Sequence, residues 1–277
     1  MEKEIKLIAM DIDGTIFGED KSLHEETKKM IEKAASQGLQ MVIATGRALE
    51  AVPKEILELS GLTYISTSNG SSIFTLPDLK RIYNKCLNDI QFQTMLTFYE
   101  KYHCPLEVFV DGGAYAPDYY VRSPENYGVS GRGIDYVQST RHPVKDSLAF
   151  ILDHKTSIEG ANFIVTDPEL KKRMMTELRA ENCLYVTSSV PRYVEISHID
   201  VCKRSALRWL TEELGLNREN VMAFGDGNND IEMIEYAGVG VAMENGMDAL
   251  KKAADQIAPP CEKNGVAQFL SKFFCLN

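Results

Sequence analysis

The sequence contains no apolar run that approaches the roughly 20 residues needed to span a bilayer. It also lacks a run rich in lysine and arginine, since its 30 basic residues are scattered among 40 acidic ones and the net charge is −10. An acidic chain without a basic patch argues against nucleic acid or a membrane surface as a partner. We therefore expect neither, and if the ligand is a phosphate, its charge must be met by a metal ion or a few local cations.

Paired cysteines are missing as well. The six cysteines are scattered without a CxxC pair, which favours reduced thiols over a disulfide framework or a zinc site. The first residues, MEKEIK, do not have the charged-then-apolar order of a signal peptide. Together these absences predict a cytoplasmic protein. A hydrophobic content of 44% over 277 residues is enough for a sizeable core in one or two domains.

The most informative stretch that is present joins four apolar residues, Leu7 to Met10, to the sequence DIDGT at 11–15. Four apolar residues are too few for a helix, but they suit a strand that is buried on both faces of a parallel sheet. Open α/β sheets bind their ligands at the carboxyl ends of such strands. Asp11 and Asp13 therefore predict chemistry at this edge of a sheet.

Both end portions of the chain alternate short apolar segments with amphipathic ones. We predict strands at residues 7–10, 39–44, 63–68, 193–197, 221–224, 239–243 and 256–258. The first helix is expected to begin with a capping box of Ser22 and Glu25, and the second to run to residue 59. This alternation predicts an α/β fold with a doubly wound, Rossmann-like parallel sheet, formed by residues 1–82 and 192–277.

The middle of the chain follows a different pattern, in which helices alternate with antiparallel strands. We predict helices at 89–102 and 168–180, and strands at 106–110, 114–121, 148–153 and 183–188. The span 120–144, rich in Gly, Pro, Arg and Ser, has no readable period. Residues 83–191 are therefore expected to form an inserted α+β domain, which could close over the site as a lid and choose the leaving group.

Two carboxylates in one loop can divide the work of a phosphoryl transfer. Asp11 could attack phosphorus as a nucleophile, while Asp13 protonates the leaving oxygen and then activates water. Because a carboxylate repels an anionic phosphate, a cation must lie between them. Mg²⁺ suits this position, since it prefers hard oxygen ligands. The sequence therefore predicts Mg²⁺ as a cofactor.

The sequence GDGNND at 225–230 supplies further carboxylates after a second buried strand. If that strand is a parallel neighbour of the first, Asp226 reaches the same edge as Asp11 and becomes a second metal ligand. Asp230, about one helical turn further on, is better placed to orient the ligands. The alternative is an ordinary N-capping turn, in which Asp and Asn are favoured for their local hydrogen bonds.

Two further residues are weaker signals for phosphate binding. Thr45, followed by Gly46, could donate its hydroxyl and a backbone N–H to phosphate oxygens, and Lys203, at a predicted helix start, could offset negative charge. Taken alone, Thr45 is better explained as an ordinary cap and Lys203 as a solvated side chain, and only their placement together favours phosphate binding. Arg47 and Asn69 are expected at the same edge, where Arg47 could form a structural ion pair and Asn69 a turn.

Seven short motifs follow one another along the chain in a recognisable order. They are DIDGT at 11–15, ATGR at 44–47, SNG at 68–70, VEIS at 194–197 with Lys203, GDGNND at 225–230, VAMEN at 241–245 and NGVA at 264–267. In order and spacing they resemble the haloacid dehalogenase-like superfamily, and within it the Cof-type phosphatases with a large C2-type α+β cap. The resemblance covers both ends of the chain, whereas 83–191 resembles the cap only in size and position.

This resemblance implies a role for each matching residue. Asp11 would be the nucleophile that forms an aspartyl-phosphate, and Asp13 the acid/base. Phosphate would be held by Thr45, Gly46, Lys203 and Asn229. Mg²⁺ would be held by Asp11, the carbonyl of Asp13 and Asp226, with Asp230 in support. Two positions depart from the family, because Cys202 stands where serine is common and Gly246 where alanine is common.

The leading hypothesis is a Mg²⁺-dependent phosphomonoesterase that acts on a small phosphorylated metabolite such as a sugar phosphate. A phosphomutase of hexose phosphates on the same core stays open. A receiver-like switch that only accepts a phosphoryl group is a third alternative, although it would leave Asp13 idle. His198 is predicted nearest the active edge, and the candidates for lining the substrate pocket in the inserted domain are Tyr115, Tyr119, Tyr120 and Arg122.

Overall fold

The computed structural model describes residues 4–18 and 21–276, so the prediction for MEKEIK lies partly outside the described residues. The chain forms two compact units. Unit 1 takes its residues from 1–46, 53–83 and 202–277, and unit 2 consists of 47–52 and 84–201. In the described part of the chain, the helices are all too short or too polar to cross a membrane.

Unit 1 is built on an eight-stranded sheet with the order β14-β13-β12-β1-β2-β3-β4-β5. Its strands are β1 (Leu7–Met10), β2 (Gln40–Ala44), β3 (Leu62–Thr67), β4 (Ser72–Thr75), β5 (Arg81–Asn84), β12 (Val221–Gly225), β13 (Val239–Met243) and β14 (Gln256–Ala258). The neighbours from β14 to β3 pair in parallel, and β4 pairs antiparallel with β3. The predicted doubly wound parallel sheet is confirmed.

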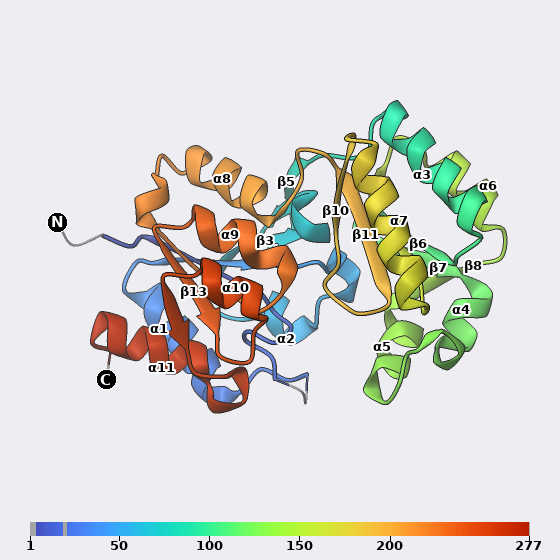
Figure 1. Cartoon of the computed structure of the whole chain (residues 1–277). Helices are drawn as coiled ribbons and strands as arrows, with labels where there is room; N and C mark the ends of the chain where they lie inside the picture. Colours follow the sequence, from blue (N-terminus) through green and yellow to red (C-terminus); the bar gives the residue numbers. More distant parts are fainter. Residues whose placement is uncertain (1–3, 19–20, 277) are drawn as a thin grey trace. The chain divides into compact units, whose positions relative to one another are not determined.

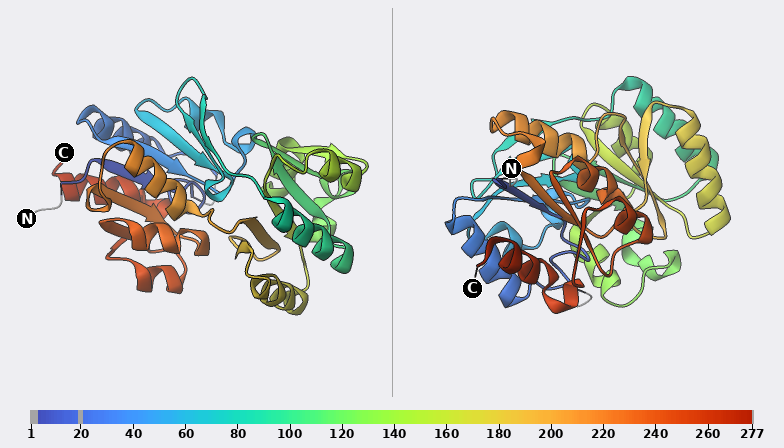
Figure 2. Two further views of the ribbon diagram at one scale, coloured as in Figure 1. Left: turned by 90° about the horizontal axis from the view of Figure 1, so that it is seen from above. Right: turned by 60° about the vertical axis from the view of Figure 1, so that its left-hand side comes forward.

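Helices cover both faces of this sheet (Figures 1 and 2). One face carries α1 (Glu25–Ser36) and α11 (Gly265–Phe274), and the other carries α8 (Lys203–Glu213), α9 (Ile231–Tyr236) and α10 (Asp248–Ala253). Alternate residues of each strand serve the two layers, as β12 illustrates. Ala223 belongs to the apolar cluster with α8, α9 and α10, whereas Phe224 packs edge-on against Phe269 of α11 at 5.4 Å between ring centroids.

The register of the sheet determines which residues meet at its carboxyl edge. Met10, the last residue of β1, lies beside Phe224 of β12 and Ile43 of β2. The next residue, Asp11, donates its backbone N–H to the Phe224 carbonyl at 3.1 Å. The residues that follow β1, β2 and β12 therefore lie along one edge, as a parallel sheet requires.

Unit 2 is an α+β structure around a six-stranded sheet with the order β10-β11-β9-β6-β7-β8. Its strands are β6 (Leu106–Val110), β7 (Gly113–Pro117), β8 (Arg141–Val144), β9 (Ile158–Ile164), β10 (Leu184–Thr187) and β11 (Tyr193–His198). Its helices are α3 (Asp89–Tyr102), α4 (Asp118–Arg122), α5 (Arg132–Thr140), α6 (Ser147–Asp153) and α7 (Pro168–Ala180). Only β7 and β8 pair in parallel among the described strands of this sheet.

Two segments of unit 2 differ from the sequence-based prediction in type. The span 148–153 was predicted as a strand but forms helix α6, which Asp146 caps by accepting a hydrogen bond from the Ala149 N–H at 3.0 Å. A short apolar run fits a strand and a buried helix equally, and the cap residue decides between them. The strand predicted to reach residue 121 ends at Pro117, where α4 begins.

Strand β9 was not predicted, although it lies at the centre of the sheet between β11 and β6. All seven of its residues are buried, yet its sequence IEGANFI interrupts the apolar pattern with a glutamate, a glycine and an asparagine. Strand β11 was predicted, but within the parallel core. It pairs antiparallel with β9 and β10 and therefore belongs to unit 2. The prediction was wrong because the sequence of a strand does not show which strands it pairs with.

The two helices after β1 and β2 begin differently from the prediction. Helix α1 starts after His24 without a side-chain cap, and Leu23 forms an isolated β-bridge with Phe17. The helix therefore begins at Glu25 itself, and its N-cap residue is His24, two positions later than the predicted Ser22. In place of one long second helix, the structure has a 3₁₀ turn at 49–51 and the four-residue α2 (Lys54–Leu57), since Pro53 keeps the residue before it extended.

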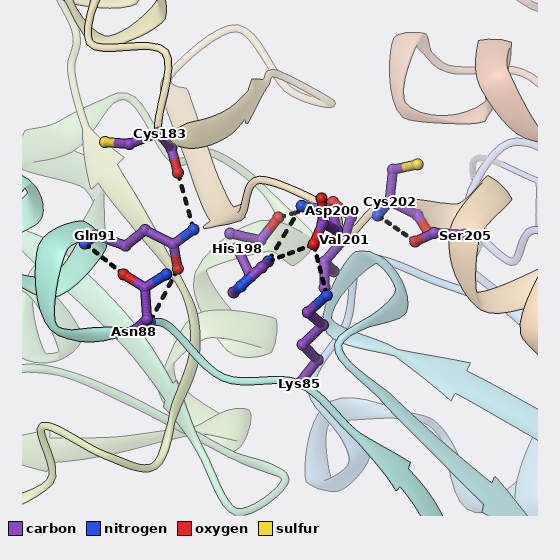
Figure 3. Close-up of polar contacts among 10 residues, drawn as sticks. Lys85, Asn88, Gln91, Cys183, His198, Asp200, Val201, Cys202 and Ser205 are labelled. Atoms are coloured by element: carbon purple, nitrogen blue, oxygen red, sulfur yellow. Dashed lines mark hydrogen bonds and ion pairs between the residues drawn. The ribbon is translucent and has the colours of Figure 1, made fainter.

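The segments of unit 2 that lead to and from unit 1 are joined by an ion pair (Figure 3). Lys85 Nζ lies 2.7 Å from Asp200 Oδ2, and the Asp200 N–H donates to His198 Nδ1 at 3.1 Å. The sequence prediction left a role for His198 open, and here it ends β11. In unit 1, α8 begins where the Cys202 N–H donates to the Ser205 hydroxyl at 2.9 Å.

Candidate active site

Lys203 is the buried centre of the site. Its side chain, 0% exposed, donates to Asp11 Oδ1 at 2.7 Å and to Asp230 Oδ1 at 2.6 Å. Burial works against the ammonium charge, but attraction from the two carboxylates outweighs burial and raises the pKa of Lys203 above its ordinary value. Two of the three ammonium N–H groups are engaged in this way. A residue that in isolation fits a solvated lysine is instead a buried cation.

Three carboxylates surround this part of the sheet edge. Asp11, Asp226 and Asp230 each offer an oxygen, and these atoms lie within 4.8 Å of one another. Burial, reinforced by repulsion from neighbouring carboxylates, raises the pKa of Asp11 to about 7 and that of Asp226 to about 8. Three carboxylates thus face one ammonium group. A cluster of oxygen donors with excess negative charge fits a hard divalent cation such as Mg²⁺.

Contacts from two neighbouring loops hold Asp226 beside the loop that follows β1. Thr15 Oγ1 donates to Asp226 Oδ1 at 3.3 Å, and the Met247 N–H donates to the Asp226 carbonyl at 2.9 Å. Gly14 has φ +82°, and a Cβ there would overlap the Asp226 carboxylate. Gly246 is similarly close, since a Cβ would lie 3.0 Å from the Asp226 carbonyl oxygen.

Asp230 is fully buried, and both of its oxygens accept hydrogen bonds within the protein. Oδ1 accepts from Lys203, and Oδ2 accepts from the backbone N–H groups of Asp226 at 3.1 Å and Gly227 at 2.9 Å. These bonds orient Lys203 and the Asp226 loop at the same time.

Asp13 lies in a different environment from Asp11. Its side chain is 37% exposed, compared with 10% for Asp11, and Lys21 Nζ lies 2.9 Å from its Oδ1. The sequence offered no sign of this pairing, because a lysine eight residues away forms no motif with the aspartate. One loop thus presents a buried carboxylate and an open one.

Thr45 and Asn229 lie at the same edge and are connected through Asn69. Thr45 is 1% exposed, and its carbonyl accepts the Asn69 N–H at 3.1 Å. Asn229 Nδ2 donates to Asn69 Oδ1 at 3.0 Å. Gly46 is adjacent, since a Cβ on it would lie 3.1 Å from Asn69 Oδ1. The structure therefore brings together the ends of β1, β2, β3 and β12 with the start of α8.

Other candidate residues have contacts within unit 2. Arg47 Nη1 donates to the Ala51 carbonyl at 2.9 Å, and its guanidinium lies 4.7 Å from the centroid of the Tyr136 ring. Tyr115 stacks on His142 and makes a tilted ring contact with Phe150. The remaining candidates from the inserted domain are the buried Tyr120, which contacts the Tyr193 hydroxyl at 3.3 Å, the half-exposed Tyr119, and Arg122, which pairs with Asp118.

Asn245 links two loops near the site, and the sequence analysis did not predict this role. Its Nδ2 donates to the Gly14 carbonyl at 2.8 Å, and its Oδ1 accepts the Cys261 N–H at 3.0 Å. It thereby joins the loop after β1 to the turn that precedes α11. The only sequence signal was its place in VAMEN, the sixth of the seven motifs.

Comparison with known proteins gives matches over nearly the whole chain. The model of the haloacid dehalogenase-like hydrolase family matches residues 8–270. The 5-amino-6-(5-phospho-D-ribitylamino)uracil phosphatase YcsE of Bacillus subtilis is 31% identical over 96% of this chain and 94% of its own. A second phosphatase of that name, YitU, is 28% identical over 100% of both chains. The solved structure of a haloacid dehalogenase-like hydrolase from B. subtilis shares the fold, with a TM-score of 0.84 and 24% identity over 96% of this chain and 99% of its own.

Proposed function

The chain belongs to the haloacid dehalogenase-like hydrolase family and is a phosphatase of that family, and from this premise we propose that it hydrolyses a small phosphorylated metabolite through an aspartyl-phosphate on Asp11. The observation that carries the proposal is the group formed by Asp11, Asp226 and Asp230 around Lys203. Its carboxylate oxygens lie within 4.8 Å of one another at the carboxyl edge of the sheet. A site of this charge and composition suits phosphoryl transfer, in which positioning and electrostatics do most of the work.

We assign Mg²⁺ as the cofactor, with Asp11, the Asp13 carbonyl and Asp226 as its ligands and Asp230 as the residue that orients them. When bound, Mg²⁺ offsets the negative charge that would otherwise keep phosphate from Asp11. The raised pKa values of Asp11 and Asp226 support this assignment, because both carboxylates lack sufficient positive charge in their surroundings. Lys203 supplies one fixed positive charge beside Asp11.

In the first step, an ionised Asp11 oxygen attacks phosphorus and forms an acyl phosphate, and the bond from phosphorus to the substrate oxygen breaks. Asp13 gives its proton to that oxygen, so the leaving group departs as a neutral alcohol. In the second step, Asp13 takes a proton from water as the water attacks phosphorus, which releases inorganic phosphate and restores Asp11. The exposed position of Asp13 suits proton exchange with solvent and substrate.

Phosphate oxygens would be held by donors that surround Asp11. We assign this role to the Thr45 hydroxyl, the Gly46 N–H, Asn229, and the third N–H of Lys203. Because these groups are fixed by a buried network before any substrate arrives, they cost little reorganisation during the reaction.

The names of two relatives suggest which substrate to test first. Both are phosphatases of 5-amino-6-(5-phospho-D-ribitylamino)uracil, at 31% and 28% identity over nearly full-length matches. We propose that this chain acts on a compound of that kind or on a sugar phosphate, that unit 2 selects the leaving group, and that the enzyme works in the cytoplasm.

The test measures phosphate release by purified full-length protein with Mg²⁺ across a panel that includes this uracil derivative and hexose phosphates. We expect release from at least one compound, loss of that activity in Asp11→Asn, and loss on chelation with recovery on adding Mg²⁺. Activity in Asp11→Asn equal to that of the wild type would overturn the assignment. Isomerisation of a hexose 1-phosphate without free phosphate would indicate a mutase instead.

A further inference from the structure

The loop after β3 has an unusual backbone. Three successive residues, Ser68, Asn69 and Gly70, have φ of 50°, 55° and 105°. Left-handed conformations cost about 1–2 kcal/mol for most L-residues and less for Asn, whose short polar side chain tolerates them. Strain of this kind persists where surrounding contacts determine the backbone, and it is concentrated at functional sites.

The contacts of this loop explain what holds the strained backbone. The Asn69 N–H donates to the Thr45 carbonyl at 3.1 Å, which fixes the loop beside the end of β2. Gly70 fits closely against the start of α8, because a Cβ there would lie 2.5 Å from the Cys202 carbonyl oxygen. The loop is therefore packed between Thr45, which precedes Gly46, and Cys202, which precedes Lys203.

The side chain of Asn69 reaches a third part of the site. Its Oδ1 accepts a hydrogen bond from Asn229 Nδ2 at 3.0 Å, and both side chains are buried, with 7% and 6% exposure. The same Asn69 oxygen lies beside Gly46, where a Cβ would come within 3.1 Å. One amide thus contacts both of the loops that we assign to phosphate binding.

We propose that Asn69 is a positioning residue for phosphate binding, which acts by orienting the Asn229 amide relative to the Thr45–Gly46 loop. This inference rests on the proposed function. With one N–H of Asn229 donated to Asn69, the plane of the Asn229 amide is fixed, and its other N–H has a set direction. Asn69 itself need not touch the phosphate.

The test uses Asn69→Gly, which keeps the left-handed backbone and removes the acceptor oxygen. Inorganic phosphate is titrated into the Mg²⁺-loaded full chain by calorimetry. We expect phosphate affinity to fall about fivefold, a typical effect of losing one hydrogen bond, with Mg²⁺ affinity unchanged within about twofold. Asn182→Gly is the matched control, because Asn182 is also left-handed, with φ 52°, but belongs to unit 2. Its phosphate affinity should equal that of the wild type.

A double-mutant cycle separates positioning from loss of structure. If Asn69 acts through Asn229, then Asn229→Ala weakens phosphate binding about fivefold in the wild type but less than about twofold in Asn69→Gly. Asn69→Asp retains both the acceptor oxygen and tolerance of the left-handed backbone, so Asn229→Ala should keep its full effect there. This second background also serves if Asn69→Gly does not fold.

The possible failures can be told apart. A wild-type protein that binds Mg²⁺ but neither binds inorganic phosphate nor hydrolyses any phosphate ester would overturn the proposed function, and this inference with it. A wild type that binds phosphate, together with Asn69→Gly that binds it equally well, would overturn only the role of Asn69. Additive effects of the Asn69→Gly and Asn229→Ala changes would overturn it as well.

Discussion

Replacing Lys203 by methionine tests the buried charge network most severely. Methionine keeps much of the side-chain volume but leaves Asp11 and Asp230, which lie 2.7 and 2.6 Å from the ammonium, without their cation. Removing one partner of a buried ion pair costs about 3–5 kcal/mol, because the remaining charge is left desolvated. We expect Lys203→Met to lower the free energy of unfolding of unit 1 by this amount at pH 8 in the presence of a chelator.

The effect should depend on pH in a defined direction. The pKa of Asp11 is already raised from 3.8 to about 7, and loss of Lys203 raises it further. A carboxyl group whose pKa is raised by folding destabilises the folded state as pH increases from the unfolded pKa to the folded one. Protonation relieves the repulsion on the acidic side. The cost of Lys203→Met should therefore be smaller at pH 5 than at pH 8, by about 1–2 kcal/mol.

Urea denaturation measures this change through the only tryptophan in the sequence. Trp209 lies on α8 and packs against Tyr83 at 5.0 Å between ring centroids, so its fluorescence reports unit 1. Arg208→Met is the matched control on the same helix. Arg208 is 63% exposed and pairs loosely with Glu212 at 3.8 Å, so its loss should change stability by no more than about 0.5 kcal/mol. Equal costs for the two variants, or a Lys203→Met cost that is independent of pH, would refute the reasoning.

Two further predictions concern the metal site. Because burial and neighbouring carboxylates raise the pKa of Asp11 to about 7 and of Asp226 to about 8, Mg²⁺ must displace protons, and its affinity should rise between about pH 6 and pH 8. Calorimetry in buffers with different heats of ionisation measures the released protons, and a pH-independent affinity without proton release would contradict the charge argument. Gly14→Ala should weaken Mg²⁺ binding at least about tenfold, because the new Cβ overlaps the Asp226 carboxylate. Gly38→Ala controls for backbone strain, since Gly38 has φ +88° with nothing within 4 Å of a Cβ, and equal Mg²⁺ affinities for the two variants would count against the assigned ligands.

Much of the parallel core could be predicted from sequence because its central strands β1, β2 and β12 are short buried runs followed by Asp11, Thr45 and Asp226. LIAM followed by Asp11 is the clearest example, and the expected parallel pairing of β1 with β12 is confirmed. Unit 2 was harder to predict because its strands are irregular. Strand β9 carries Gly160 and two buried polar residues, Glu159 and Asn162. Their hydrogen-bond partners include Gly112 in the turn after β6 and Glu107 of β6, which are distant along the chain.

The candidate site was predictable only as far as its motifs extend. The sequence placed Asp11, Asp226 and Lys203 at one edge, where the structure has them. It could not show that Lys203 contacts both Asp11 and Asp230, because these residues are 192 and 27 positions away along the chain. The pairing of Lys21 with Asp13 was also invisible, since it depends on the path of a loop and on no repeating pattern.

The most direct test of the central claim is to find the phosphoryl group on the protein. Mg²⁺-loaded enzyme is mixed with a phosphate ester that it hydrolyses, quenched in acid during turnover, and digested for mass spectrometry. The account predicts phosphate on the peptide that contains Asp11, with Asp13→Asn prolonging the lifetime of that species, because water is no longer activated. Turnover with an unmodified Asp11 peptide, or with phosphate on another residue, would contradict it.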